Sequence, residues 1–154
     1  MKIVLVHPQI PPNTGSIGRL CAATGTPLVL VEPLGFSLED RYLKRAGLDY
    51  WPWIDLTIAP DWRSALPEGS TPWLFTARGR RSFHEVTYAP GDLLVFGRET
   101  TGLPEALLDA FPADRQLRIP FENRNVRSLN LAQCAAVALY EARRQLGIGT
   151  TSTE

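Results

Sequence analysis

The sequence has little of what membrane, disulfide-rich or metal-binding proteins usually contain. No apolar run approaches the roughly 20 residues that a membrane-spanning helix requires, so no membrane span is expected. There are two cysteines, Cys21 and Cys134, and two histidines, His7 and His84, and none of them has a partner at metal-ligand spacing. We therefore expect no metal, and we interpret these four residues as structural.

The chain also has no net charge and very little lysine. Sixteen basic residues balance sixteen acidic ones, and only Lys2 and Lys44 among the basic residues are lysine. A net charge of zero neither supports nor excludes nucleic-acid binding, because one face can still concentrate one sign. The G-x-G-x-x-G fingerprint is missing, which disfavours a dinucleotide-dependent oxidoreductase.

What is present is typical of one folded domain. With 154 residues, of which 44% are hydrophobic, the chain is long enough for a single core, and we expect one domain over residues 1–148 and a disordered tail over 149–154. The first apolar run, 2–7, is short and lacks a cleavage site. It therefore favours a buried strand over a signal peptide, and the cytoplasm is the expected compartment.

Apolar runs alternate with segments of helical spacing along the whole chain. This alternation predicts an α/β fold, a mostly parallel sheet with helices on both faces. The expected strands are 2–7, 28–31, 56–58, 72–76, 92–96 and 116–119. The expected helices are one around 17–24, one from a Ser37 cap to about 46, and then 61–66, 104–111 and about 128–146.

Three loops at predicted strand ends carry unusual residues. The first, Pro12-Asn13-Thr14-Gly15-Ser16-Ile17-Gly18-Arg19, feeds a helix whose free N–H groups favour an anion, and Arg19 is expected one turn inside that helix. Two interpretations stay open for it. Asn13 and Arg19 belong to a binding site, or Asn13 or Thr14 is only an N-cap and Arg19 is solvated.

The second loop runs from Val95 to Pro104 and contains Gly97 and Gly102. Glycines here allow close approach of the backbone to a ligand. Glu99 between them either accepts hydrogen bonds from a ligand or braces the loop. A plain strand-to-helix turn is the alternative.

The third loop runs from Ile119-Pro120 to Arg127-Ser128-Leu129-Asn130-Leu131. Ser128 is the expected N-cap of the last helix. Asn130 is then an unexpected residue inside the first turn, because asparagine is a poor helix former that can hydrogen-bond in two directions.

In this order the three loops resemble the signature motifs of the SPOUT RNA methyltransferases. The chain is most similar to the minimal members, which methylate the ribose 2′-hydroxyl of the tRNA wobble nucleotide. Further similar segments at 20–22, 32–36, 45–50 and 140–142 extend the resemblance over nearly the whole chain.

The resemblance implies a fold, a cofactor and an assembly. The fold is a six-stranded parallel sheet with a C-terminal deep trefoil knot, and the protein is a homodimer whose first and last helices pack across the two-fold axis. The cofactor is S-adenosylmethionine, and its implied contacts are Phe75, Thr76, Gly97, Glu99, Gly102, Ile119, Ser128, Leu129 and Asn130. Arg19 and Asn13 are the implied catalytic residues, with Arg19 acting beside a cofactor bound mainly by the other subunit.

The implied reaction is methyl transfer to cytidine or modified uridine at position 34 of tRNA, with leucine tRNAs as the expected substrates. Alternatives are 2′-O-methylation of another RNA site and a non-catalytic RNA-binding homologue. Basic residues in two loops are the expected RNA contacts, although a solvated loop explains them as well. They are Arg78, Arg80, Arg81, Arg124 and Arg127.

Overall fold

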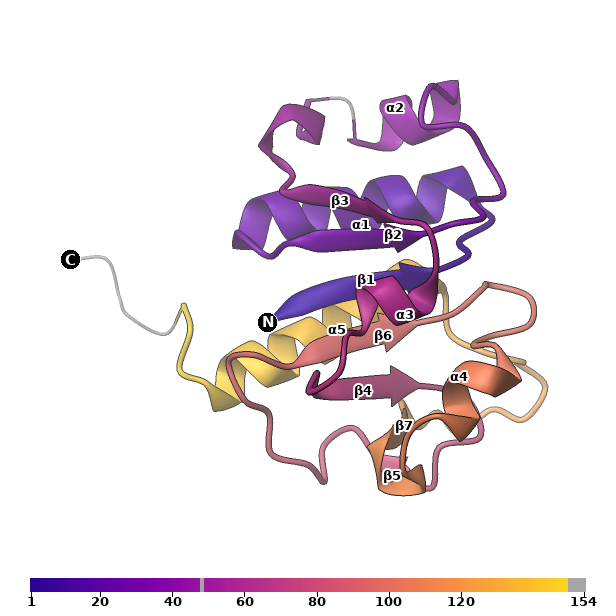
Figure 1. The fold of residues 1–154 in the computed structure, drawn as a ribbon, viewed down its shortest axis with the longest axis vertical. Helices are drawn as coiled ribbons and strands as arrows, with labels where there is room; N and C mark the ends of the chain where they lie inside the picture. The colour runs from indigo at the N-terminus through magenta and orange to yellow at the C-terminus, as the bar shows by residue number, and fades with distance from the viewer. Residues whose placement is uncertain (48, 150–154) are drawn as a thin grey trace.

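The computed structural model describes residues 1–47 and 49–149. Within them, one seven-stranded sheet has the order β3-β2-β1-β6-β4-β7-β5, and every strand pairing is parallel. Figure 1 shows β1, β2, β4 and β6 pointing the same way, and the parallel pairings of the other strands place all carboxyl ends at one edge of the sheet. The strands are β1 Lys2–Val6, β2 Leu28–Val31, β3 Leu56–Ala59, β4 Pro72–Phe75, β5 Arg81–Ser82, β6 Leu93–Phe96 and β7 Gln116–Arg118.

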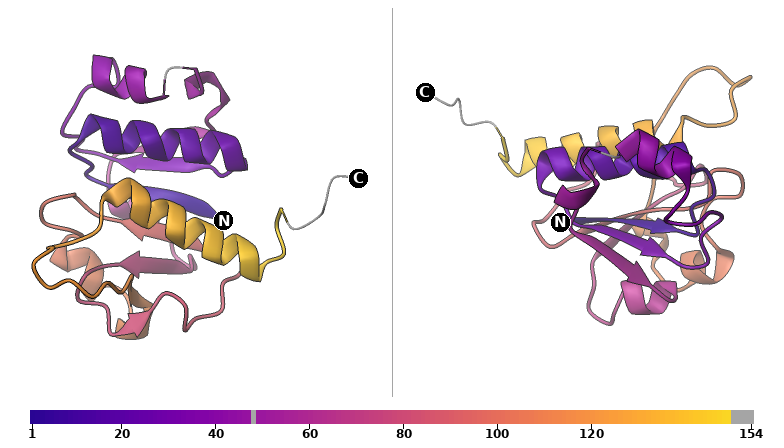
Figure 2. Two further views of the ribbon diagram at one scale, coloured as in Figure 1. Left: turned by 180° about the vertical axis from the view of Figure 1, so that it is seen from behind. Right: turned by 90° about the horizontal axis from the view of Figure 1, so that it is seen from above.

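Helices cover both faces of the sheet. On one face α1 and α5 lie side by side, as both views of Figure 2 show. The helix α2 and the 3-10 turn η1 pack on α1, and α3 and α4 lie on the opposite face of the sheet. The bounds are α1 Pro11–Thr24, α2 Arg41–Gly47, η1 Trp51–Trp53, α3 Trp62–Ala65, α4 Glu105–Asp109, η2 Ala113–Arg115 and α5 Leu131–Gln145.

The alternation of side chains along β1 explains the two cores. Ile3 and Leu5 belong to the core beneath α1 and α5, whereas Val4 and Val6 belong to the core beneath α3 and α4. All four side chains are fully buried, as expected for a central parallel strand whose alternate side chains point to opposite faces. The predicted α/β class and parallel sheet are confirmed.

Four predicted helices have the wrong bounds, and in α2 and α5 the reason is that the side chain of another residue caps the helix. The first helix begins at Pro11, since two prolines preset its first turn, and Asn13 is therefore inside the helix. The last begins at Leu131, because Asn130 rather than Ser128 is the N-cap. Asp40, not Ser37, caps α2, and α4 spans Glu105–Asp109 instead of 104–111.

The structure also adds a strand. The segment Arg81–Ser82, expected as a basic loop, pairs with β7 at the sheet edge and forms the two-residue β5. The knot stays a prediction, as does the single domain. Of the expected tail, 150–154 lies outside the described residues. Across 1–47 and 49–149, every helix is too short or too polar to span a membrane.

The end of α5 is tied to the segment 83–92 by one glutamine. Gln145 accepts a hydrogen bond from the Tyr88 N–H (3.0 Å) and donates to the Val86 carbonyl (3.0 Å). Glu141 accepts a further bond from Gln145 and two from the Arg144 guanidinium. These bonds, those from Arg144 foremost, lower the pKa of Glu141 from 4.5 to about 2.

This lowered pKa predicts a pH-dependent contribution to stability. Because the folded-state pKa lies below the usual value, the stabilisation is complete above about pH 4.5 and is lost as the pH falls toward 2. We expect Glu141→Gln to be less stable than the wild type at pH 6, and the difference to shrink between pH 4.5 and 2. Urea unfolding of both proteins across this range measures it, and a difference independent of pH would contradict it.

Candidate functional site

A cavity of about 480 Å³ opens at the carboxyl edge of the sheet. All three unusual loops reach it, although they are far apart in the sequence. Of the nine residues predicted to contact a cofactor, Gly102 is the one that does not line it. The lining residues are Ile10, Asn13, Phe75, Thr76, Ala77, Phe96, Gly97, Arg98, Glu99, Ile119, Phe121, Ser128, Leu129, Asn130, Leu131 and Cys134.

Two stacked aromatic rings form part of the wall. Phe75 ends β4 and Phe96 ends the neighbouring β6, and their ring centroids lie 4.6 Å apart at an interplanar angle of 17°. Both rings are almost completely buried, at 8% and 2% exposed. The cavity therefore has a rigid apolar wall at the strand ends, with Ile119 and Phe121 adding further apolar surface.

The glycine loop after β6 closes on itself. The N–H of Arg98 donates to the Gly102 carbonyl (3.1 Å), and the Gly102 N–H donates back to the Arg98 carbonyl (2.9 Å). Gly102 has a φ of 73°, which favours glycine. A Cβ on Gly97 would lie 2.1 Å from the Gly102 carbonyl carbon and 2.3 Å from the Leu103 nitrogen. Both glycines are thus required by the turn itself.

The closed turn directs Glu99 toward the start of α1. Its carboxylate accepts hydrogen bonds from the N–H groups of Gln9 (2.9 Å) and Ile10 (3.0 Å), and from the Asn13 side-chain amide (3.4 Å). Of the two roles left open by the sequence, the structure therefore gives Glu99 the bracing one. A carboxylate also suits the positive end of the α1 dipole.

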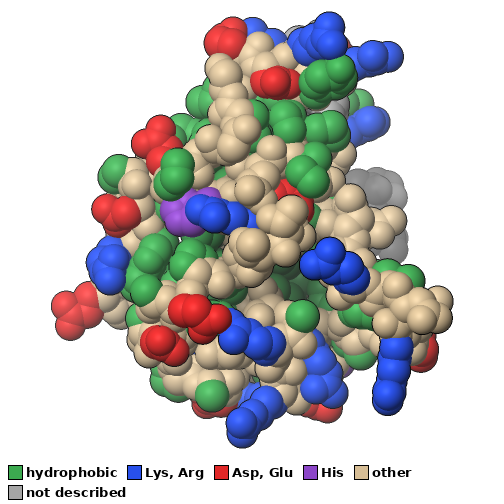
Figure 3. Space-filling model, turned by 90° about the vertical axis from the view of Figure 1, so that its right-hand side faces the viewer, with side chains coloured by type: hydrophobic (Ala, Val, Ile, Leu, Met, Phe, Trp, Pro, Cys, Tyr) green, Lys and Arg blue, Asp and Glu red, His purple; other side chains and the backbone are tan. Residues whose placement is uncertain are grey.

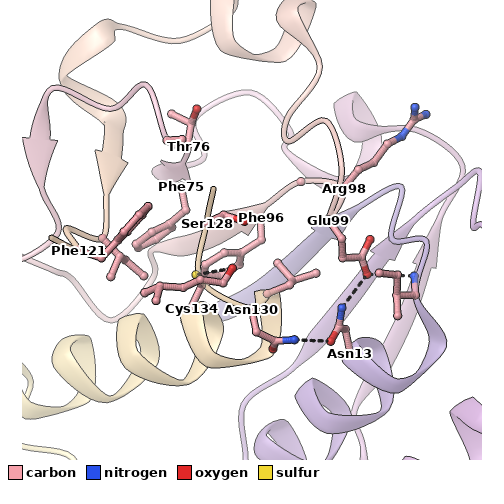
Figure 4. A pocket seen from close by; sticks show the side chains of 16 residues that line it. Asn13, Phe75, Thr76, Phe96, Arg98, Glu99, Phe121, Ser128, Asn130 and Cys134 are labelled. Carbon is pink, nitrogen blue, oxygen red and sulfur yellow. Dashed lines mark hydrogen bonds between the residues drawn. The ribbon is translucent and has the colours of Figure 1, made fainter. Parts of the chain in front are cut away.

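Asn13 continues this chain of hydrogen bonds to the last helix. Its side-chain oxygen accepts a bond from the Asn130 amide (2.9 Å), as Figure 4 shows. The oxygen of Asn130 caps α5 by accepting from the N–H groups of Ala132 (2.9 Å) and Gln133 (3.3 Å). We call Glu99, Asn13 and Asn130 the bracing chain. It joins one residue from each of the three loops.

Substitutions at Asn130 separate its two roles. Asn130→Ala loses the cap and the bond to Asn13, so we expect a loss of roughly 2 kcal/mol in unfolding free energy and roughly fivefold weaker cofactor binding. Asn130→Ser keeps a capping oxygen, so it should lose only about half as much unfolding free energy as Asn130→Ala. Its cofactor binding should be as weak as that of Asn130→Ala. Thermal melts and calorimetric titration with S-adenosylmethionine measure both. Normal binding by either variant would contradict the bracing role.

Arg19 lies away from this cavity within its own chain. It is eight residues into α1, about two turns rather than the one turn predicted, and it is exposed and absent from the cavity lining. Its guanidinium carbon lies 4.6 Å from the centroid of the Tyr50 ring. Asn13, in contrast, lines the cavity and has both ends of its amide engaged.

The predicted RNA-contacting arginines are all at the surface, but they differ in their partners. Arg78 pairs with Glu105 (2.6 Å), and Arg81 donates to the Glu85 carbonyl (2.8 Å). Arg80 is exposed, and among the described residues its side chain has no hydrogen bond or ion pair. Figure 3 shows basic side chains on the face that holds the carboxyl ends of the strands. Arg124 and Arg127 are exposed in the loop before α5.

Several lining residues were missed by the sequence analysis. Ile10 precedes the first loop, Arg98 lies inside the second and Phe121 inside the third, so their closeness to the motif residues was the available signal. Arg98 points away from the bracing chain in Figure 4. Cys134, interpreted as core, is half-buried at the cavity, and burial raises the pKa of its thiol to about 11. It is thus a neutral wall residue at physiological pH.

In the described part of the chain, no three His, Cys, Asp or Glu side chains gather closely enough to hold a metal ion. The polar groups at the cavity are instead amides, hydroxyls, one carboxylate and one guanidinium. Such a set binds an organic ligand by hydrogen bonds around an apolar centre.

A known protein family matches the part of the chain that contains all three motif loops. The model of the SpoU rRNA Methylase family matches residues 1–140. The chain therefore belongs to the SpoU methylase family, and the resemblance inferred from the three motifs is confirmed.

Relatives within the family are similar over nearly their whole length. The tRNA (cytidine(34)-2′-O)-methyltransferase of Methylovorus glucosotrophus is 50% identical over 145 residues, which cover 93% of this chain and 94% of that protein. The enzyme of the same name from Escherichia coli K12 is 47% identical over 149 residues, with coverages of 96% and 94%.

Solved structures share the fold. One, from work on the 2-OH methylation of C/U34 on tRNA, has a TM-score of 0.88 and 48% identity, and the match covers 95% of both chains. An AdoMet-bound rRNA methyltransferase from Sinorhizobium meliloti has a TM-score of 0.82 and 27% identity, and covers 94% of this chain and 56% of the other.

Proposed function

We propose that the protein transfers a methyl group from S-adenosylmethionine to the ribose 2′-hydroxyl of nucleotide 34, a cytidine or uridine, in tRNA. The observation that carries the proposal is the meeting of the three motif loops in one cavity through the bracing chain. Relatives named for this reaction are about half identical to the chain over nearly all of it. Leucine tRNAs are the proposed substrates.

The cavity fits S-adenosylmethionine in size and chemistry. Its volume of about 480 Å³ is typical of sites for ligands of this size. Phe75, Phe96 and Ile119 offer apolar surface to the adenine, and the backbone groups of Gly97 and Leu129, which line the same cavity, would be available to hydrogen-bond to the nucleoside. The cofactor supplies a methyl group on a sulfonium sulfur. Transfer would form the O–CH₃ bond as the S–CH₃ bond breaks, and would release S-adenosylhomocysteine and the hydroxyl proton.

Arg19 is the proposed catalytic residue of this chain. A guanidinium is a poor base because it stays protonated in proteins, so its role is to hold the neighbouring phosphate and to stabilise charge developing on the 2′-oxygen. Water or another group accepts the proton. Asn13 is a positioning residue, because its amide is fully used in the bracing chain.

The position of Arg19 favours a homodimer. Since Arg19 is exposed and outside the cavity of its own chain, the proposed reaction needs it beside the cavity of a partner subunit. α1 and α5 lie side by side on one face, and α5 exposes Val137 (43%) and Tyr140 (57%) there. Apolar side chains of this kind are common in dimer interfaces. We propose that this face joins the two subunits.

The tRNA backbone is the proposed partner of the exposed arginines. Arg80, Arg124 and Arg127 are the strongest candidates, because none of their side chains is engaged among the described residues. Arg78 and Arg81 already have partners and are secondary candidates. The cytoplasm is the proposed place of action, since it contains the substrate.

One experiment tests the proposal directly. The purified protein is incubated with methyl-labelled cofactor and total tRNA, and 2′-O-methylation is mapped by nucleotide. Label at the ribose of nucleotide 34 is expected. Label at another position would favour a different RNA site, and failure to bind S-adenosylmethionine in a titration would favour a non-catalytic RNA-binding protein.

A further inference from the structure

Arg19 is held by an aromatic ring and not by a carboxylate. Its guanidinium carbon lies 4.6 Å from the centroid of the Tyr50 ring, within the range of a cation–π contact. The ion pairs among the described residues involve other basic groups, Lys44, Arg78 and Arg144, and none includes Arg19. Tyr50 is thus the contact that orients this side chain.

The type of contact matters for a catalytic arginine. A carboxylate would occupy two of the five N–H donors in the guanidinium plane and would offset its charge. Beside the Tyr50 ring, the Arg19 side chain donates no hydrogen bond to any described residue, so its N–H donors stay available. Tyr50 can therefore restrict the motion of Arg19 without using the groups that Arg19 needs for phosphate and oxygen.

The local fold is built to place Tyr50 at this point. The turn η1 packs on α1 next to Arg19, where Gly18 has no side chain to keep it away. A Cβ on Gly18 would lie 2.8 Å from the Ile54 side chain and 3.5 Å from the Trp51 ring. The Tyr50 carbonyl accepts a bond from the Trp53 N–H (2.9 Å), which fixes the start of the turn.

We infer that Tyr50 is a positioning residue for methyl transfer, which holds the Arg19 guanidinium by a cation–π contact while leaving its N–H donors free for substrate. The inference rests on the proposed function, in which Arg19 is catalytic. It assigns a role to a residue that lies outside all three motif loops and outside the cavity.

The test compares Tyr50→Leu with Tyr50→Phe. Leucine keeps apolar cover on α1 but removes the ring, so kcat should fall about 5- to 30-fold with the cofactor Kd unchanged. Phenylalanine keeps the ring and should stay within about twofold of the wild type. In NMR spectra the Arg19 Hδ and Hε protons should show a ring-current shift in the wild type and in Tyr50→Phe, and lose it in Tyr50→Leu.

Tyr42→Leu is the matched control, because Arg41 stacks on Tyr42 at 4.8 Å in the neighbouring helix. It should leave kcat unchanged. Full activity of Tyr50→Leu, or equal loss in both Tyr50 variants, would overturn the inference. The inference would also be overturned if Tyr50→Leu lowered kcat by the same factor in an Arg19→Ala background. A residue that acts through Arg19 should have no effect on kcat once Arg19 is removed. Wild-type turnover by Arg19→Ala alone would instead remove the proposed role of Arg19.

Discussion

Arg19→Ala should bind S-adenosylmethionine as the wild type does and should transfer methyl groups roughly 100- to 1000-fold more slowly. This decrease in rate is the one typically seen when an enzyme loses one hydrogen-bond donor that stabilises charge developing on an oxygen. Cofactor binding should persist because Arg19 is exposed and does not line the cavity of its own chain. Single-turnover methylation at saturating tRNA gives the rate, and calorimetric titration gives the cofactor Kd.

Arg63→Ala is the matched control for this prediction. Arg63 is also an exposed arginine stacked on an aromatic ring, at 4.3 Å from Trp62, but it lies in α3 on the opposite face of the sheet. Arg63→Ala should change neither the methylation rate nor the cofactor Kd. An Arg19→Ala protein with wild-type turnover would exclude Arg19 from catalysis, and one that no longer binds cofactor would assign Arg19 to the cofactor site.

Gly97→Ala should destabilise the protein by about 3 kcal/mol and abolish measurable cofactor binding. The added Cβ would lie 2.1 Å from the Gly102 carbonyl carbon and 2.3 Å from the Leu103 nitrogen. Both are backbone atoms of the closed turn, so no side-chain rotation relieves the overlap. The turn must open, and Glu99 then leaves the start of α1. For a domain of this size the melting temperature should fall by roughly 6–12 °C.

Gly91→Ala serves as the control, since a Cβ there has no atom within 4 Å and the backbone is not left-handed. We expect a change within about 0.5 kcal/mol, or slight stabilisation because alanine restricts the unfolded chain. Differential scanning calorimetry of both variants makes the comparison. A Gly97→Ala protein that melts and binds like the Gly91→Ala protein would contradict the account of the turn.

Local patterns were sufficient to predict the sheet and the position of the site. Strands such as 28–31 and 93–96 are short buried runs bounded by turn residues, and the motif loops follow strand ends, where ligands of parallel sheets bind. The glycine loop was predictable as well. Its two glycines mark a backbone geometry that few other residues allow.

Capping and long-range pairing were not predictable in the same way. Ser128 and Asn130 are both good caps, and the choice of Asn130 depends on Asn13, which lies 117 positions earlier. The roles of Glu99 and Tyr50 depend likewise on partners that only the folded chain brings close. The two-residue β5 escaped prediction because its pairing with β7 rather than its composition makes it a strand.

The bracing chain also has a consequence for the order of folding. Its members belong to the first helix, the loop after β6 and the start of the last helix. Contacts between such distant parts form late, because the intervening chain must first be ordered. A nascent chain that has not yet released its last helix from the ribosome therefore lacks Asn130 and the other cavity residues of the third loop. The protein should acquire its cofactor only after synthesis of almost the whole chain.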